Sequence, residues 1–175
     1  FDPESIQQVE DGTFWLSDEF GPFLLHVDAT GKLLDEPISL PDVQAPQNPY
    51  LKDPAYANLP SSRGFEGLAL SIDGTKLYPI LEGALATDRD QTRRIIYEFD
   101  LATKSYTEKR FFYKVEAPNH SIADFIAINE NEFLVNERDG TKGDLNGFKR
   151  VFKIDLRDSD QDGFVDKEEI VNLLN

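Results

Sequence analysis

The chain has 175 residues, of which 39% are hydrophobic, 33 are acidic and 18 are basic, so its formal net charge is −15. This charge disfavours binding to nucleic acid and to anionic membrane surfaces, and no run of about 18 apolar residues is present that would span a bilayer. The negative charge makes cations the natural partners. Cysteine is absent, which excludes disulfides and thiolate zinc sites.

Three similar units follow one another along the chain. Each begins with an acidic residue at the start of a short apolar segment, passes through a turn, and ends a second segment with a glutamate four residues after an aromatic. The acidic pairs, separated by 15, 16 and 13 residues, are Glu4 and Glu19, Glu66 and Glu82, and Asp124 and Glu137. Because an antiparallel hairpin returns to the level where it began, we expect both carboxylates of a pair at one end of a sheet.

Further strand-like segments complete each unit. A third segment with period-two alternation ends at Asp28, Asp100 or Asp155, and in the first two units a fourth follows near 33–40 and 106–115. This pattern predicts an all-β fold, a β-propeller with about three four-stranded blades that start near residues 4, 66 and 124. A β-sandwich with accidental repeats is the alternative. A propeller needs about four blades to close, so we expect the rest of a longer protein, or a partner chain, to complete the ring.

A calcium-binding pattern occupies residues 158–169. Acidic residues stand at positions 1, 3, 5, 9 and 12 of a twelve-residue EF-hand loop, and Gly163 stands at position 6, where a sharp turn is needed. The predicted ligands are the side chains of Asp158, Asp160, Asp162, Asp166 and Glu169 and the main-chain carbonyl of Phe164. A solvated acidic turn is the alternative.

A short helix is expected to follow this loop over 167–174. Residues 158–175 would then form a structural calcium clip that is inserted in, or appended to, the third blade of a propeller portion spanning 1–157. We expect the clip at the end of the blades opposite to the paired glutamates, because it replaces the turn that follows the third strand in the other two units.

Four segments resemble the phytase-like propeller family, described as having esterase-like activity of phytase. They are DPESI at 2–6, GTFWLSDEFGP at 12–22, RGFEGLALS at 63–71 and FLVNERD at 133–139. The resemblance spans about residues 1–156. It implies an exported protein, secreted or periplasmic, whose metal-dependent propeller hydrolyses phosphoesters and of which this chain is a portion.

The paired carboxylates form the candidate catalytic face, which consists of Glu4, Glu19, Glu66, Glu82, Asp124 and Glu137. Converging like charges need a counter-charge, and a calcium cluster would supply it, clamp a phosphate and lower the pKa of a bound water. The residues expected to bind the phosphoryl group of a small-molecule substrate are Arg63, Arg94, Arg138 and Lys149. Ion pairing with the glutamates is the alternative role for these cations.

Two functional readings therefore remain open. The first is a calcium-dependent phosphoesterase. The second is a non-catalytic propeller that binds a ligand or a protein on the carboxylate face and uses calcium as a structural staple. Of the two histidines, His26 is expected to be structural, whereas His120 is expected near the carboxylate end.

Overall fold

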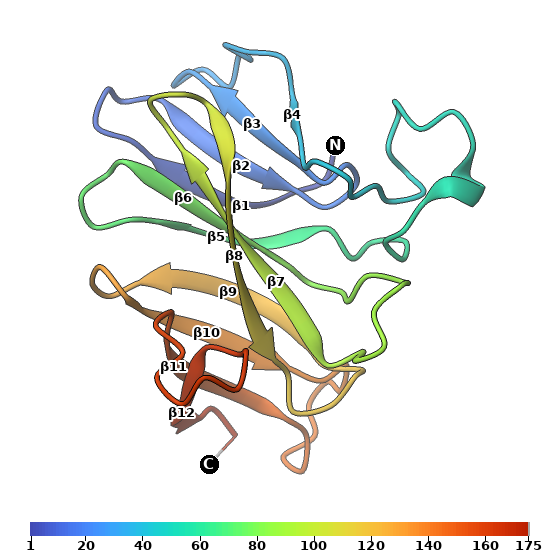
Figure 1. Cartoon of the computed structure of the whole chain (residues 1–175), viewed down its shortest axis with the longest axis vertical. Coiled ribbons are helices and arrows are strands. Elements are labelled where there is room, and N and C mark those ends of the chain that lie inside the picture. The colour runs from blue at the N-terminus through green and yellow to red at the C-terminus, as the bar shows by residue number, and fades with distance from the viewer. Residues whose placement is uncertain (175) are drawn as a thin grey trace.

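The computed structural model describes residues 1–174 as three four-stranded antiparallel sheets, arranged side by side as propeller blades (Figure 1). Blade 1 contains β1 (Pro3–Gln8), β2 (Phe14–Asp18), β3 (Phe23–Val27) and β4 (Ile38–Ser39). Blade 2 contains β5 (Phe65–Leu70), β6 (Lys76–Leu81), β7 (Arg93–Asp100) and β8 (Ser105–Lys114). Blade 3 contains β9 (Ser121–Ala127), β10 (Glu132–Arg138), β11 (Lys149–Asp155) and β12 (Asp166–Asn172). Strands that are consecutive in the chain are neighbours in each sheet, which confirms the predicted all-β propeller architecture.

The fourth strand of blade 1 is shorter than the segment 33–40 predicted for it. Only Ile38 and Ser39 pair with β3, and an isolated bridge joins Val27 to Leu33. Pro37 has no N–H group to donate to a sheet, so the ladder cannot run through it.

The helix predicted over 167–174 is wrong, because β12 occupies most of this segment and pairs antiparallel with β11. The open edge of β11 supplies the main-chain hydrogen bonds, and Lys153 of β11 forms an ion pair with Glu168 of β12 at 3.3 Å. Such cross-strand pairs stabilise a sheet. Positions 1 to 8 of the calcium-binding pattern therefore lie in the connection between β11 and β12, and positions 9 to 12 lie in β12 itself. Within residues 1–174 the single helical element is the 3-10 turn η1 (Pro54–Tyr56), and no helix is long and apolar enough to cross a membrane.

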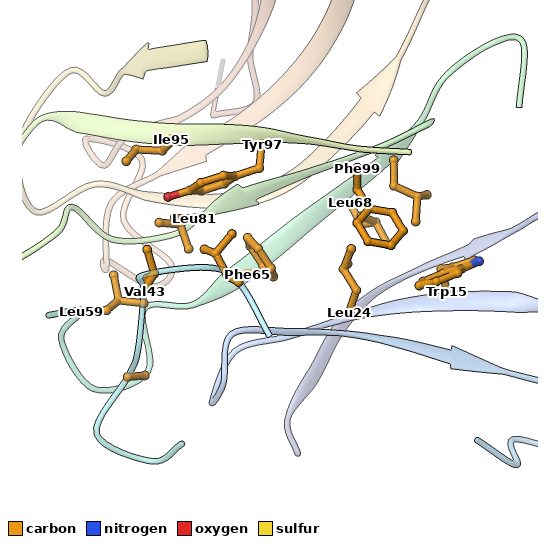
Figure 2. Close-up of a cluster of buried hydrophobic side chains, with 13 residues drawn as sticks. Trp15, Leu24, Val43, Leu59, Phe65, Leu68, Leu81, Ile95, Tyr97 and Phe99 are labelled. Atoms are coloured by element: carbon orange, nitrogen blue, oxygen red, sulfur yellow. The ribbon is translucent and has the colours of Figure 1, made fainter. Parts of the chain in front are cut away.

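The hydrophobic core lies in two layers, one on each face of blade 2. The layer shared with blade 1 includes Trp15, Leu24, Phe65 and Phe99, and Figure 2 shows these side chains facing one another across the two blades. The layer shared with blade 3 includes Tyr78, Ile80, Phe125 and Phe133. Burial of one large apolar side chain contributes about 1.5–3 kcal/mol, so these layers hold the blades in fixed relative positions.

Candidate functional site

The first strands of blades 1 and 2 each contain a β-bulge, and in both the unpaired residue is a glutamate, Glu4 or Glu66. The partner glutamates Glu19 and Glu82 directly follow β2 and β6. The main-chain N–H of Glu19 donates to Asp2 O at 3.0 Å, and that of Glu82 donates to Gly64 O at 2.8 Å. Since a bulge redirects a side chain at the end of a strand, both hairpins present their two glutamates at the same end.

These acids form two overlapping groups. Carboxylate oxygens of Glu19, Glu66 and Glu82 lie within 4.8 Å of one another, and oxygens of Asp2, Glu4 and Glu19 meet the same limit. Glu19 belongs to both groups. Only 7% of Glu19 and 6% of Glu82 are exposed to solvent. We call these five acids the carboxylate cluster; Asp2 was not predicted, although its position directly opposite Glu19 in the hairpin would have identified it.

Burial and mutual repulsion keep part of the carboxylate cluster protonated near neutral pH. Burial, followed by the charges of Glu82 and Glu4, raises the pKa of Glu66 to about 8. The same causes raise the pKa of Glu19 to about 7. The pKa of Glu4 is also raised, first by burial and then by the charge of Asp2. A divalent cation would replace these protons and remove the repulsion.

Gly64 allows the two blades to meet closely at the carboxylate cluster. A Cβ atom at Gly64 would lie 2.0 Å from the main-chain oxygen of Glu19, so any larger residue would push the blades apart. The glycine thus brings Glu19 of blade 1 to the acids of blade 2.

Two arginines provide positive charge beside the carboxylate cluster. Nη1 of Arg63 lies 3.0 Å from Oε2 of Glu82, and Nη2 of Arg138 lies 3.8 Å from Oε1 of the same carboxylate. Both guanidinium groups are partly exposed, so they can also donate to a ligand. The predicted positions of Arg63 and Arg138 near the acids agree with this geometry, and their pairing with Glu82 matches the alternative role considered for them.

Blade 3 does not contribute its predicted acids to the carboxylate cluster. Its bulge lies at Ala123, so the residues equivalent to Glu66 and Glu82 are Ala123 and Arg138. A shift of one residue turns a side chain to the opposite face of a strand. The spacing of 15 between Ala123 and Arg138 equals that between Glu4 and Glu19, whereas the predicted pair was separated by 13.

Glu137 instead lies fully buried between blades 2 and 3. Its carboxylate accepts hydrogen bonds from Tyr113 Oη at 2.6 Å, from the main-chain N–H of Glu116 at 2.7 Å and from Lys167 Nζ at 2.9 Å. His120 Nδ1 lies 2.7 Å away from it. Burial raises the pKa of Glu137, but these hydrogen bonds outweigh burial and hold the pKa below its ordinary value. Glu137 is therefore an ionised, buried residue that connects blades 2 and 3 through hydrogen bonds, and His120 is one of its partners.

The remaining predicted residues lie outside the carboxylate cluster or form hydrogen bonds and ion pairs with other residues. Asp124 is exposed, and its carboxylate accepts a hydrogen bond from the adjacent main-chain N–H of Phe125. Arg94 is buried and donates to the main-chain oxygens of His120 and Pro118 at 2.8 and 3.2 Å. Lys149 pairs with Asp139. We therefore assign structural roles to Arg94 and Lys149.

The predicted calcium loop brings three of its acids together. Carboxylate oxygens of Asp158, Asp160 and Asp166 lie within 4.8 Å of one another. The Asp162 carboxylate accepts a hydrogen bond from Phe164 N at 2.8 Å. Glu169 lies three residues along β12 from Asp166 and forms an ion pair with Arg150. A strand extends by about 3.3 Å per residue, which explains why position 12 does not return to the loop as it does on a helix.

The loop also fastens blade 3 to blade 2. Val165 is buried in the layer between these blades, and its N–H donates to Phe112 O of β8 at 2.9 Å. The loop starts from Asp155, which pairs with Glu132 at the end of blade 3 opposite to Arg138. Any cation held by the aspartates would stabilise this contact between blades.

A proline-rich flap, residues 41–62, adjoins the carboxylate cluster and projects from the blades (Figure 1). Its base is anchored, because Asn48 Nδ2 donates to Gly21 O at 3.0 Å. Its outer part exposes 62% of Tyr50 and 77% of Tyr56. The hydroxyl of Ser62, at the end of the flap, lowers the pKa of Glu19 slightly against the larger effects of burial and of the neighbouring acids, so the flap ends beside the cluster.

Comparisons with known proteins show similarity to a protein family and to a secreted protein. The sequence model of the phytase-like family, described as esterase-like activity of phytase, matches residues 1–175. An uncharacterized secreted protein of Arthroderma benhamiae is 31% identical over 133 residues, which are 62% of this chain and 26% of that protein. The matched part of the chain thus spans about a quarter of the length of this relative.

The likeness to a solved structure of hydrazine synthase supports the fold. Hydrazine synthase of Kuenenia stuttgartiensis matches 98% of this chain and 42% of its own, with a TM-score of 0.58 and 12% identity. Virginiamycin B lyase of Staphylococcus aureus matches 96% of this chain and 41% of its own, with a TM-score of 0.48 and 10% identity. At such low identity the likeness to hydrazine synthase concerns the arrangement of blades alone.

Proposed function

Because the chain belongs to the phytase-like family, we propose that it carries the calcium-dependent phosphoesterase site of an exported propeller protein. The observation that supports this function best is the convergence of Asp2, Glu4, Glu19, Glu66 and Glu82, two of them with pKa values of about 7 and 8. Partly protonated, converging carboxylates are typical of a site whose counter-charge is a bound cation. The secreted relative supports export.

The carboxylate cluster fits calcium by its chemistry. All of its side-chain donors are carboxylate oxygens, which calcium prefers, and Glu19 can serve two neighbouring cation positions because it belongs to both groups. Calcium bound there would neutralise the acids, polarise a phosphoryl oxygen and make a bound water more acidic.

The residues of the chain have distinct roles in this proposal. The glutamates of blades 1 and 2 hold the cation. Arg63 and Arg138 donate hydrogen bonds to the phosphoryl oxygens, on which negative charge accumulates during hydrolysis. Water attacks phosphorus, the ester P–O bond breaks, and the leaving oxygen takes up a proton. The substrate is a phosphorylated small molecule.

We also propose a second, structural calcium site in the loop between β11 and β12. Its ligands are Asp158, Asp160 and Asp166, with Asp162 and the carbonyl of Phe164 completing the loop's oxygen donors. The close approach of three aspartates supports it, as does the contact of Val165 with blade 2. This cation would act on stability and not on turnover.

A non-catalytic propeller that binds a ligand or protein is the competing function. It is favoured by the exposed tyrosines of the flap and by the engagement of both arginines with Glu82. The two functions predict different results for phosphoester hydrolysis. In the intact protein that contains this chain, hydrolysis of p-nitrophenyl phosphate should require calcium and stop when a chelator removes it. If no phosphomonoester or phosphodiester is turned over while calcium still binds, the binding function is correct.

A further inference from the structure

A cavity of about 620 Å³ lies between blades 1 and 2 at the end opposite to the carboxylate cluster. Its inner wall is formed by Trp15 and His26 of blade 1. Its outer wall is formed by turns of blade 2, which include Thr75 and Leu101. The volume lies in the range of small-molecule binding sites, and the walls are largely apolar.

Trp15 is held rigidly in this wall. The indole stacks on the imidazole of His26 with ring centroids 4.4 Å apart and planes inclined by 9°. The imidazole is fixed in turn, because Nε2 lies 2.8 Å from Thr13 Oγ1 and Nδ1 lies 2.6 Å from Asp35 Oδ2. Phe99 supports the indole on its core side at 5.2 Å. The direction of the indole N–H is therefore set before any ligand arrives.

The indole N–H donates to no acceptor among residues 1–174, and its nitrogen reaches solvent although Trp15 as a whole is only 2% exposed. Its nitrogen points away from the buried cluster (Figure 2), toward the end of the blades where the cavity opens. An indole N–H that reaches solvent at the edge of an apolar wall can donate to a ligand in place of water. The cavity thus offers an apolar wall with one directed donor.

The charges around the cavity disfavour anions. Glu10, Asp11 and Asp100 lie around it, and Lys104, the one cation that lines it in the described chain, pairs with Asp35 at 2.5 Å. Hydrogen bonds from threonines hold the pKa values of Asp11 and Asp100 below their ordinary value, so both stay ionised. A negatively charged ligand would meet net repulsion here.

We propose that this cavity binds a small organic molecule that carries no negative charge and has an apolar, ring-sized body and a hydrogen-bond acceptor that receives the Trp15 N–H. The site is separate from the carboxylate cluster and needs no cation. It gives the protein a second ligand, whose rigid donor and apolar walls select a carbonyl or ether attached to an aromatic or aliphatic ring.

The single tryptophan of the chain makes the test direct. In ¹H–¹⁵N spectra the indole signal belongs to Trp15, and in a longer protein the Trp15→Phe variant identifies it. Acetanilide, an uncharged ring with a carbonyl, should shift this signal saturably, and phenylacetate should bind about tenfold more weakly because of its charge. Ala102→Phe, which places a larger side chain at the cavity, should abolish the shift. Ala29→Phe, in the equivalent turn of blade 1, should not.

Contact of the ligand with the indole ring gives a readout independent of variants. Magnetisation transfer from acetanilide protons to the Trp15 indole protons in the unaltered chain should be observed. The proposal is overturned if acetanilide causes no saturable shift up to its solubility limit. An equal shift in folded Ala102→Phe, or equal binding of phenylacetate, would overturn it as well.

Discussion

Arg63 joins two blades through one guanidinium nitrogen, which lies 3.0 Å from Oε2 of Glu82 and donates to Ser121 Oγ of β9 at 2.7 Å. The arginine thus neutralises one acid of the carboxylate cluster and holds blade 3 beside it. Arg63 and a calcium ion would compete for the charge of Glu82. The stability that calcium adds should therefore depend on whether Arg63 is present.

Replacing Arg63 with Ala should destabilise the calcium-free protein by about 1–2 kcal/mol, because Glu82 keeps only its longer contact with Arg138. Calcium should restore more stability to this variant than to the wild type, since the freed carboxylate gains a ligand role. Thermal melts with calcium and with chelator measure both effects. An equal calcium-induced rise in Tm for both proteins would contradict the shared role of Glu82.

The calcium-free protein should lose stability as the pH rises toward 8. The pKa values of Glu19 and Glu66 rise from 4.5 to about 7 and 8 in the folded chain, so between these limits the folded state binds more protons than the unfolded state. The free energy of unfolding therefore falls through this window. Chelator-treated protein, unfolded in urea at several pH values, should show this fall.

The double variant Glu19→Gln with Glu66→Gln is the control for the pH effect. It removes the two titrating groups but retains the remaining acids of the chain, so its stability should depend less on pH over the same window. If both proteins have the same pH profile, the two glutamates are not the groups that titrate.

Gly64→Ala should destabilise the protein by about 2 kcal/mol, because the new methyl group meets the main-chain oxygen of Glu19. It should also weaken calcium binding, since Glu19 moves away from Glu66 and Glu82. Gly140→Ala is the matched control, because a Cβ there has no atom within 4 Å. Calorimetric titration of the folded variants measures the affinities, and equal values for the two alanine variants would refute the close approach.

Glu137→Gln should cost about 3 kcal/mol or more, because the fully buried carboxylate of Glu137 carries the charge paired with Lys167. Turnover by the folded variant should remain close to that of the wild type. Asp124→Asn changes an exposed acid, which the sequence pattern matched with Glu137 as one acidic pair. This variant should change stability little. Loss of activity without loss of stability in Glu137→Gln would place this acid in the catalytic site after all.

The loop between β11 and β12 should bind calcium with a Kd on the order of 10⁻⁴ M or weaker, as isolated extracellular sites do. Asp160→Asn should remove this site. Glu169→Gln should change its affinity by less than about twofold, because Glu169 pairs with Arg150 on the strand. A large loss of affinity in Glu169→Gln would show that β12 rearranges to bring position 12 to the cation.

The repeated hairpins predicted the blades, because acid, turn, aromatic and glutamate recur at intervals that are typical of a repeated supersecondary unit. The carboxylates of blades 1 and 2 were predictable for the same reason. The prediction of site residues in blade 3 was wrong because it followed residue type, Asp124 and Glu137, and not the spacing of 15 residues that leads to Ala123 and Arg138. The position of a bulge, which decides the face that Glu137 occupies, is set by contacts between strands that a single sequence does not reveal.

Features that join separate units could not be predicted from any one of them. The cavity beside Trp15 arises where turns of blade 2 approach blade 1, and the ties of Glu137 come from three different strands or loops. The strand β12 was mistaken for a helix because its acidic start follows a loop that is usually flanked by helices, whereas here the free edge of β11 determines its conformation.

The central claim, that the carboxylate cluster hydrolyses phosphoesters with calcium, is tested most directly by kcat/KM for p-nitrophenyl phosphate at saturating calcium. The comparison is between the intact wild-type protein, Glu66→Gln and Glu108→Gln, whose exposed side chain on β8 lies outside the cluster. Glu66→Gln should lower kcat/KM by about 100-fold or more with little change in Tm, because it removes a proposed cation ligand, while Glu108→Gln should match the wild type. Equal kcat/KM values for all three folded proteins would contradict the claim.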